Sequence, residues 1–216
     1  MSPTENTAPP EQALALNYAR PELRKPLDLF FRFDDRLARV VLLATEPLPA
    51  QLRLAWWREQ FAKPVADRPH GEPMLEEMGR DWPGCERYCL ALVDGWELLL
   101  QEFPLEKGAL DEFAAGRAAP FASMQTDPAY STATELCGKI WALADLAAKL
   151  SDGDLKREVV GEGRVLLGNM PTLPRDMRFL TVLAGLGRRA LVKGGAPLLA
   201  DRASVAVALR LGLLGR

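Results

Sequence analysis

The chain has 216 residues, and its 27 Lys and Arg against 29 Asp and Glu leave a formal charge of -2, so its charge indicates neither a nucleic-acid-binding surface nor an acidic tail. Hydrophobic residues at 48% and charged residues at 26% are typical of a globular domain with a large core, which excludes a chain that is disordered throughout. Three cysteines without a C-x-x-C pair (Cys85, Cys89, Cys137) and a lone His70 argue against a disulfide framework or a zinc site and favour reduced, cytoplasmic thiols.

The two ends of the chain suggest a tail and an apolar terminal segment. The first residues, MSPTENTAPPE, are polar and Pro-rich and lack the basic start and apolar centre of an export signal, so we expect a flexible tail over residues 1–14 and one domain over 15–216. The most apolar stretch, Ala196 to Leu214, is interrupted by three charged residues, Asp201, Arg202 and Arg210, which are too many for a spanning helix. We therefore expect a cytoplasmic protein, with peripheral attachment to a membrane left open.

Helix is the dominant signal along the chain. Strand-type alternation is missing, and runs rich in Ala, Leu, Arg and Glu are separated by Pro or Gly, so the sequence predicts an all-α fold. The first half predicts a helix over 26–44 with apolar residues at three- and four-residue steps, a second over 49–62 that forms a hairpin with it, and a short one over 74–80.

The second half predicts longer helices separated by turn-forming residues. Their expected ranges are 86–103, 105–124, 127–150, 155–167, 175–192 and 197–214. Asp127 is placed to cap the third of these helices, with Pro128 at its first position. No segment repeats along the chain, so we expect one compact helical bundle.

Asp34 and Asp35 are the most suggestive polar pair, because carboxylates on the inner wall of a bundle can hold divalent cations for a diphosphate. Two carboxylates that share a Mg²⁺ ion on one helix should be about four residues apart, yet Ala38 and Arg39 occupy those positions. Adjacent side chains diverge by roughly 100° around the helix axis, so the two aspartates cannot both face one metal ion. Because arginines surround the pair, a solvated ion-pair face is the favoured interpretation.

Trp56, Trp57 and Arg58 form a distinctive cluster in a chain with five tryptophans. Since adjacent side chains on a helix diverge, we expect one indole in the core and the other at a groove or interface, with Arg58 available for stacking. Packing is the favoured interpretation of the cluster, with ligand binding as the alternative.

The order of several segments resembles the squalene/phytoene synthase family. The similarity rests on Tyr18-x-Arg20-Pro21-Glu22-x-x-Lys25, on Leu29-Phe30-Phe31-Arg32-Phe33-Asp34-Asp35 and, most specifically, on Arg53-Leu54-x-Trp56-Trp57-Arg58-Glu59. Weaker similarity follows at 92–95, 138–150 and 163–167. The chain looks most like the short, motif-poor branch that includes an assembly factor of respiratory complex I. The resemblance implies the isoprenoid-synthase helical bundle and, in active members, Mg²⁺-dependent head-to-head condensation of two prenyl diphosphates.

The resemblance also implies two Asp-rich motifs on facing helices, and both are degraded in this chain. The first retains only Asp34 and Asp35. In the second, Asp145 stands at the family's Asn and Lys149 at its Asp, which leaves Asp154 as a later carboxylate. A cation where a metal ligand should be opposes Mg²⁺ binding, so we expect no catalytic residue, cofactor or metal. If the chain were active, Mg²⁺ would be its cofactor and Asp34 and Asp35 its ligands.

Three functional hypotheses follow. The first is a catalytically silent protein that binds a lipid or prenyl chain, or a partner at a membrane surface, with ligand-binding candidates taken from the resembling segments: Tyr18, Arg32, Trp57 and Arg58. The second is a prenyltransferase with a rearranged metal site built from Asp34, Asp35, Asp145 and Asp154. The third is a helical interaction module without a cavity, whose centre is filled by side chains such as Phe33, Trp57 and Trp141. If Lys149 lies beside Asp145 inside the bundle, an ion pair has replaced the metal.

Overall fold

The computed structural model describes residues 8–151, 153–168 and 170–215, and in these ranges it contains ten α-helices and no strand. The all-α fold class is therefore confirmed. The helices are α1 (Pro10–Tyr18), α2 (Pro21–Leu42), α3 (Pro47–Ala62), α4 (Pro73–Asp81), α5 (Glu86–Glu97), α6 (Ala109–Ala122), α7 (Ser131–Lys149), α8 (Asp154–Val165), α9 (Arg178–Val192) and α10 (Arg202–Leu214). Single 3-10 turns lie at Val65–Asp67, Leu98–Leu100, Pro128–Tyr130 and Arg175–Met177.

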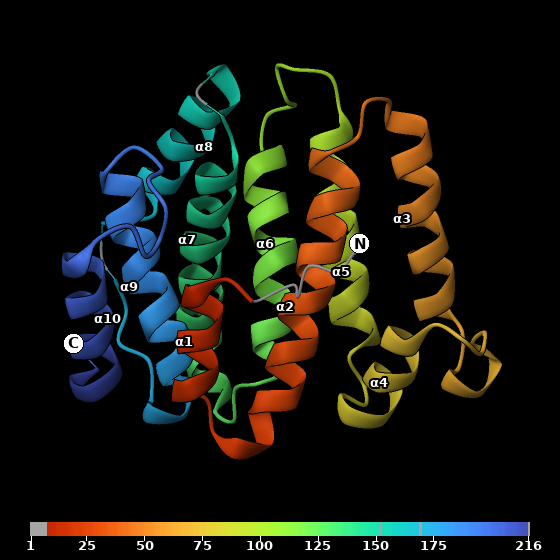
Figure 1. Cartoon of the computed structure of the whole chain (residues 1–216), viewed down its shortest axis with the longest axis horizontal. Helices are drawn as coiled ribbons and strands as arrows, with labels where there is room; N and C mark the ends of the chain where they lie inside the picture. The colour runs from red at the N-terminus through yellow and green to blue at the C-terminus, as the bar shows by residue number, and fades with distance from the viewer. Residues whose placement is uncertain (1–7, 152, 169, 216) are drawn as a thin grey trace, which may run out of the picture.

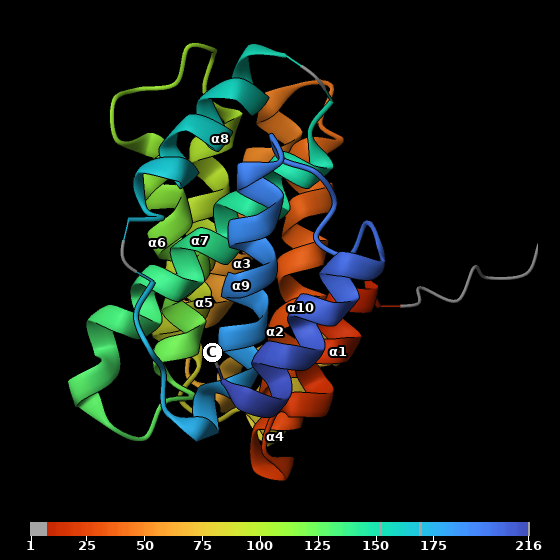
Figure 2. The same ribbon diagram turned by 90° about the vertical axis from the view of Figure 1, so that its left-hand side faces the viewer.

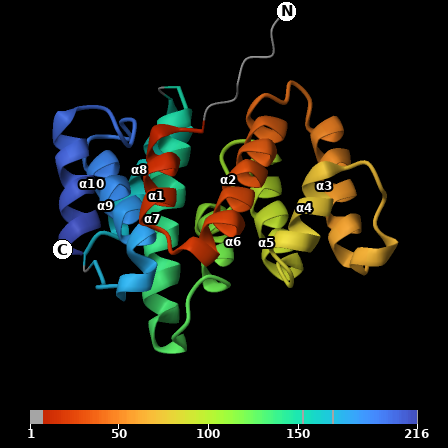
Figure 3. The same cartoon turned by 60° about the horizontal axis from the view of Figure 1, so that its bottom comes forward.

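Six helices form a layer in which each packs on the next: α3 on α5, α5 on α6, α6 on α7, α7 on α9, and α9 on α10. The helices α3 and α10 therefore lie at opposite edges of the molecule (Figure 1). Across one face of the layer, α1 packs on α9 and α2 packs on α5 (Figure 2). The two remaining helices are α4, which packs on α2, and α8, which packs on α7 (Figure 3).

Small residues let neighbouring helices of the layer approach closely. A Cβ atom added to Gly116 on α6 would collide with the carbonyl oxygen of Ala91 on α5 and would lie 3.0 Å from the Cα atom of Gly95. Close packing of this kind brings the backbones together at a point where any side chain would push them apart. It also fixes the rotation of α6, whose next residue points into the molecule.

Aromatic side chains fill the space between α2, α6 and α7. The ring centroid of Phe30 lies 5.1 Å from that of Phe121 and 5.7 Å from that of Trp141, and all three residues are buried. Edge-to-face contacts at these separations are favourable for aromatic rings. Phe33 and Trp57 are also buried, with their ring centroids 4.8 Å apart. The centre thus contains the three side chains expected for a filled bundle, namely Phe33, Trp57 and Trp141.

The prediction of a tail over residues 1–14 is wrong for residues 10–14, which are helical. Helix α1 begins at Pro10, and its residues Gln12 and Ala15 are buried. Residues 1–7 of the expected tail lie outside the described residues. A nine-residue helix with little apolar periodicity is a weak signal in sequence, and packing on α9 supplies the stability that the segment lacks by itself.

Several helix boundaries also differ from those expected. The helix α2 begins at Pro21, five residues before the expected start at Pro26. Proline is favourable in the first turn of a helix, and Pro21 occupies that position in α2. The segment 127–150 is divided into a 3-10 turn, capped by a 2.9 Å hydrogen bond from Ala129 N to Asp127 Oδ1, and the helix α7. The helix α10 begins at Arg202, because Asp201 and Ser204 form a reciprocal capping box.

None of the helices in the described ranges combines the length and the apolar character needed to cross a membrane. This agrees with the expectation for the stretch from Ala196 to Leu214.

Candidate functional site

Asp34 lies on the buried face of α2. It is four residues after Phe30 and three before Leu37, both of which are buried, so the helical repeat carries its carboxylate into the core. Its side chain is 1% exposed. The next residue, Asp35, points outward and pairs with Arg39 at 3.1 Å. The expected divergence of the two aspartates is therefore confirmed, and only Asp34 enters the interior.

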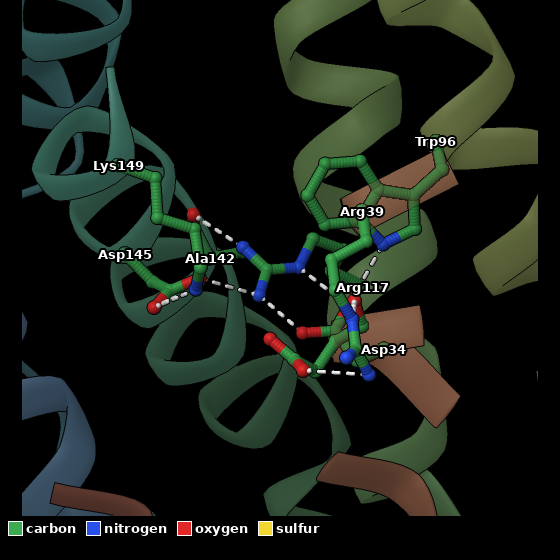
Figure 4. Close-up of polar contacts among 8 residues, drawn as sticks. Asp34, Arg39, Trp96, Arg117, Ala142, Asp145 and Lys149 are labelled. Atoms are coloured by element: carbon green, nitrogen blue, oxygen red, sulfur yellow. Dashed lines mark hydrogen bonds and ion pairs between the residues drawn. The ribbon is translucent and has the colours of Figure 1, made fainter. Parts of the chain in front are cut away.

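A fully buried arginine, Arg117 on α6, faces Asp34 (Figure 4). Its Nε donates to Asp34 Oδ1 at 2.9 Å, and its Nη2 donates to Asp34 Oδ2, so the contact is bidentate. The same Nη2 donates to Asp145 Oδ2 on α7 at 2.7 Å, and Nη1 donates to the carbonyl oxygen of Ala142 at 2.8 Å. One guanidinium group thus joins three helices.

The indole rings of Trp96 and Trp141 flank the guanidinium group of Arg117. Its Cζ atom lies 4.9 Å from the ring centroid of Trp96 and 4.4 Å from that of Trp141. Trp96 also donates a 2.8 Å hydrogen bond from Nε1 to Asp34 Oδ1. Aromatic faces are favourable neighbours for a buried cation.

Lys149 completes the cluster at its outer end. Its Nζ lies 2.6 Å from both carboxylate oxygens of Asp145, one turn earlier on the same helix. The Lys149 side chain is 27% exposed, whereas that of Asp145 is 5% exposed. The ion pair suggested for Lys149 and Asp145 is therefore present. We call Asp34, Arg117, Asp145 and Lys149 the buried charge cluster.

Two members of the cluster, Arg117 and Asp145, are held in their ionised forms by neighbouring charges. Burial alone would lower the pKa of Arg117, but Asp34 and Asp145 outweigh it and raise that pKa above its ordinary value. Burial alone would raise the pKa of Asp145, but Lys149 and Arg117 outweigh it and lower that pKa. Two carboxylates and two cations give the cluster a formal charge of zero.

This cluster does not fit a Mg²⁺ ion. A divalent cation needs carboxylate oxygens that are free to coordinate it, whereas those of Asp34 and Asp145 already accept hydrogen bonds from Arg117, Trp96 and Lys149. A metal ion between the two carboxylates would also meet the guanidinium group at contact distance. Across the described part of the chain, no group of three Asp, Glu, His or Cys residues is arranged to hold a metal ion.

The other carboxylates considered from the sequence lie outside the cluster. Asp35 pairs with Arg39 on the outer side of α2, and Asp154 pairs with Arg157 in the first turn of α8. Both Asp154 and its partner are exposed. Of the four carboxylates proposed for a rearranged metal site, the structure brings together Asp34 and Asp145 alone.

Two of the four ligand-binding candidates, Arg32 and Arg58, are engaged in ion pairs. Arg32 pairs with Asp28 at 3.0 Å and with Glu77, and Arg58 pairs with Asp94 at 2.6 Å and with Glu97. Both arginines thus form ion pairs near the surface.

The aromatic candidates serve packing. Trp57 is buried, whereas Trp56 is 37% exposed, which confirms that one indole enters the core. The expected stacking partner Arg58 is engaged in ion pairs, and Arg36 instead lies over Trp57, 4.8 Å from its ring centroid. Tyr18 packs against α10, where its ring occupies the space that a side chain on Gly212 would need.

Sequence reasoning missed Arg117 and Trp96. A signal for Arg117 was present, because it lies four residues after Phe113 and four before Phe121 in a segment that is otherwise mostly apolar. An arginine on the apolar face of a helix requires a buried acidic partner. Identifying that partner as Asp34, 83 positions away, required the structure.

Two of the pockets lie toward the edges of the helical layer. One of about 530 Å³ lies between α9, α10 and residues 170–172, and one of about 460 Å³ lies between the end of α2 and the start of α3. Asp34, Arg117 and Asp145 line neither of these two pockets.

Comparisons of the chain with models of protein families, with curated proteins and with solved structures found no match.

Proposed function

We propose that this protein is a catalytically silent bundle of the squalene/phytoene synthase type that works by binding a partner on its outer surface, as a cytoplasmic protein peripheral to a membrane. One observation carries the proposal. The guanidinium group of Arg117 lies between Asp34 and Asp145, which come from the two segments that resemble the family's Asp-rich motifs.

The chemistry of the family requires metal ions that bridge carboxylates to a diphosphate. In this chain the two carboxylates are bound to cations of the protein itself, and the cluster has no net charge with which to attract Mg²⁺. Removing either carboxylate from its partners would leave a buried charge unpaired, which is strongly unfavourable. The cluster therefore supports a structural role.

The filled centre of the bundle supports binding at the surface in preference to the interior. Phe30, Phe121 and Trp141 occupy the space between α2, α6 and α7. A prenyl chain in that space would have to displace aromatic side chains that are packed at contact distance. Surface binding needs no such rearrangement.

An assay of prenyl transfer tests the proposal. The full chain is incubated with Mg²⁺ and farnesyl or geranylgeranyl diphosphate, and release of pyrophosphate and formation of a thirty- or forty-carbon hydrocarbon are measured. We expect neither. The variants Asp34→Asn and Asp35→Asn are matched controls, because activity of a contaminant would persist in both. Product formation that the wild type shows and these variants lose would overturn the proposal.

A further inference from the structure

The outward face of α10, at one edge of the layer, is apolar. Ser204, Ala208 and Leu211 are buried on the side of α10 that packs on α9. On other sides of α10 four large apolar residues are exposed, with relative exposures between 46% and 73%: Val205, Leu209, Leu213 and Leu214. Three of them, Val205, Leu209 and Leu213, follow one another at four-residue steps and so form a stripe along the helix.

The same edge carries an excess of positive charge. Residues 178–215 contain six Lys or Arg and a single acidic residue, Asp201, although the whole chain has a formal charge of -2. Asp201 is already paired with Arg189 and Lys193. Three further arginines of this edge, Arg188, Arg202 and Arg210, form neither an ion pair nor a side-chain hydrogen bond with any residue in the described part of the chain, whereas Arg178 donates to the carbonyl oxygen of Leu211.

A pocket beside the stripe combines the same two kinds of side chain, although no residue of the stripe lines it. The pocket of about 530 Å³ between α9 and α10 is lined by apolar side chains such as Val207 and Leu211 and by two of the unpaired arginines, Arg188 and Arg210. An occupant of this region would therefore contact apolar and cationic groups together. We call the stripe of Val205, Leu209 and Leu213, with Leu214 and the three unpaired arginines, the α10 edge. Helix α10 faces the viewer in Figure 2.

The opposite edge of the molecule lacks this charge pattern. Helix α3 also exposes leucines, Leu48 and Leu52. Its Arg58, however, is paired with acidic residues of α5, Glu59 is paired with Lys63, and Arg53 is the single cation of α3 without an ion pair in the described part of the chain. A surface that carries both positive and negative charge beside its apolar side chains has little preference for an anionic partner. Helix α3 therefore serves as an internal control for the α10 edge.

We propose that the α10 edge docks on a membrane surface that contains anionic phospholipids. An interfacial helix with an apolar face and flanking cations buries its leucines at the boundary of headgroups and acyl chains while its arginines contact phosphate groups. A second copy of the chain is a poorer occupant, because α10 packed on another α10 would bring Arg202 and Arg210 close to other arginines without an unpaired acid to balance them. The inference rests on the proposed function and names the class of partner.

Binding of the full chain to lipid vesicles tests the inference. Vesicles of phosphatidylcholine alone are compared with vesicles that also contain phosphatidylglycerol, and bound protein is measured by flotation. We expect binding to the anionic vesicles alone, with weaker binding when added salt shortens the Debye length to about 8 Å. Equal binding to both kinds of vesicle, or none to the anionic vesicles, would overturn the inference.

Two variants of the α10 edge and one of α3 make the test specific. Arg202→Gln with Arg210→Gln should lower partitioning into anionic vesicles roughly 30-fold, and Leu209→Ser with Leu213→Ser roughly tenfold. The control Leu48→Ser with Leu52→Ser should bind as the wild type does. Circular dichroism and thermal melting establish that each variant is folded. A loss of binding in the α3 control equal to that in the α10 variants would contradict the assignment of this edge.

Other occupants give different results. Stabilisation by inorganic phosphate without vesicles, lost in Arg188→Gln with Arg210→Gln, would identify a site for a soluble anion and overturn the inference. A dimer in light scattering that Leu209→Ser with Leu213→Ser abolishes would identify a second copy as the occupant and overturn it likewise. Pyrophosphate release in the prenyl-transfer assay bears on the proposed function alone, so the two proposals fail separately.

Discussion

Arg117 Nε donates a 2.9 Å hydrogen bond to Asp34 Oδ1, although the two residues are 83 positions apart in sequence and each is almost completely buried. This contact joins the middle of α2 to the middle of α6. Because an unpaired charge is strongly unfavourable inside a protein, each residue depends on the other for its place in the fold.

Removal of the guanidinium group should therefore destabilise the protein severely. In Arg117→Leu, the carboxylates of Asp34 and Asp145 lose their shared partner while remaining buried. We expect the free energy of unfolding, measured by urea denaturation, to fall by about 3–5 kcal/mol. Arg58→Leu is the matched control, because Arg58 pairs with two acidic residues near the surface, and its loss should be at most about 1 kcal/mol. Equal losses in both variants would contradict a special role for burial.

Replacing the three most deeply buried charges of the cluster together, and leaving Lys149 with its side chain 27% exposed to water, should restore most of that stability. In Asp34→Leu, Arg117→Met, Asp145→Leu no buried charge is left without a partner, and such apolar replacements are often neutral. The indole N–H of Trp96 and the carbonyl oxygen of Ala142 lose their partners, at a cost of about 1–3 kcal/mol each. The triple variant should therefore be more stable than Arg117→Leu. A triple variant that is the less stable of the two would show that the cluster contributes more than its charge balance.

Asp145 should make stability depend on acid pH. Its pKa in the folded protein is lowered, so the unfolded state takes up a proton first, near its ordinary pKa of about 3.9. The stability that the carboxylate contributes is fully present above that value and is lost as the pH falls through the folded pKa. We expect Asp145→Asn to be less stable at neutral pH and to show a smaller loss of stability below about pH 4. Urea denaturation at a series of pH values measures both effects. If the free energy of unfolding of the variant falls with acid as steeply as that of the wild type, Asp145 is not the group responsible.

Glu11 should give the stability of the protein the opposite dependence on pH. Burial at the start of α1 raises its pKa above its ordinary value of about 4.5, with a smaller contribution from Asp145. The folded state therefore binds the proton more tightly, and stability falls as the pH rises from about 4.5 through the raised pKa. Glu11→Gln should increase the free energy of unfolding at pH 7 but leave it nearly unchanged at pH 4. Glu22→Gln, on an exposed residue of α2, is a control for the loss of one negative charge.

The close approach of α5 and α6 should make Gly116 intolerant of a methyl group. A Cβ at this position meets the backbone of Ala91 and Gly95, so Gly116→Ala should destabilise by about 1–3 kcal/mol. At Gly161, within α8, a Cβ atom would meet no heavy atom within 4 Å apart from the backbone of its own helix. Gly161→Ala should instead stabilise by about 0.5–1 kcal/mol, because alanine favours the helix. Thermal melting compares the two, and a harmless Gly116→Ala would show that the helices can separate at this point.

The sequence by itself determined the helical fold class and most helix positions. The helix expected over 49–62 is α3 at Pro47–Ala62, and that expected over 74–80 is α4 at Pro73–Asp81. These predictions succeed because apolar spacing and Pro or Gly breaks act within a few residues of one another. The divergence of Asp34 from Asp35 and the pairing of Asp145 with Lys149 follow from the same local geometry, since each pair lies on one helix.

Tertiary structure alone decided the rest. The nine residues of α1 carry too weak a pattern to predict a helix, and packing on α9 stabilises them. The partner of Asp34 could likewise not be predicted from the sequence. A helical repeat indicates which residues face inward, but it does not indicate which helix faces pack against each other. Only the packing of α2, α6 and α7 places Arg117 between two carboxylates from distant segments, and a contact between distant segments depends on the packing of the whole chain.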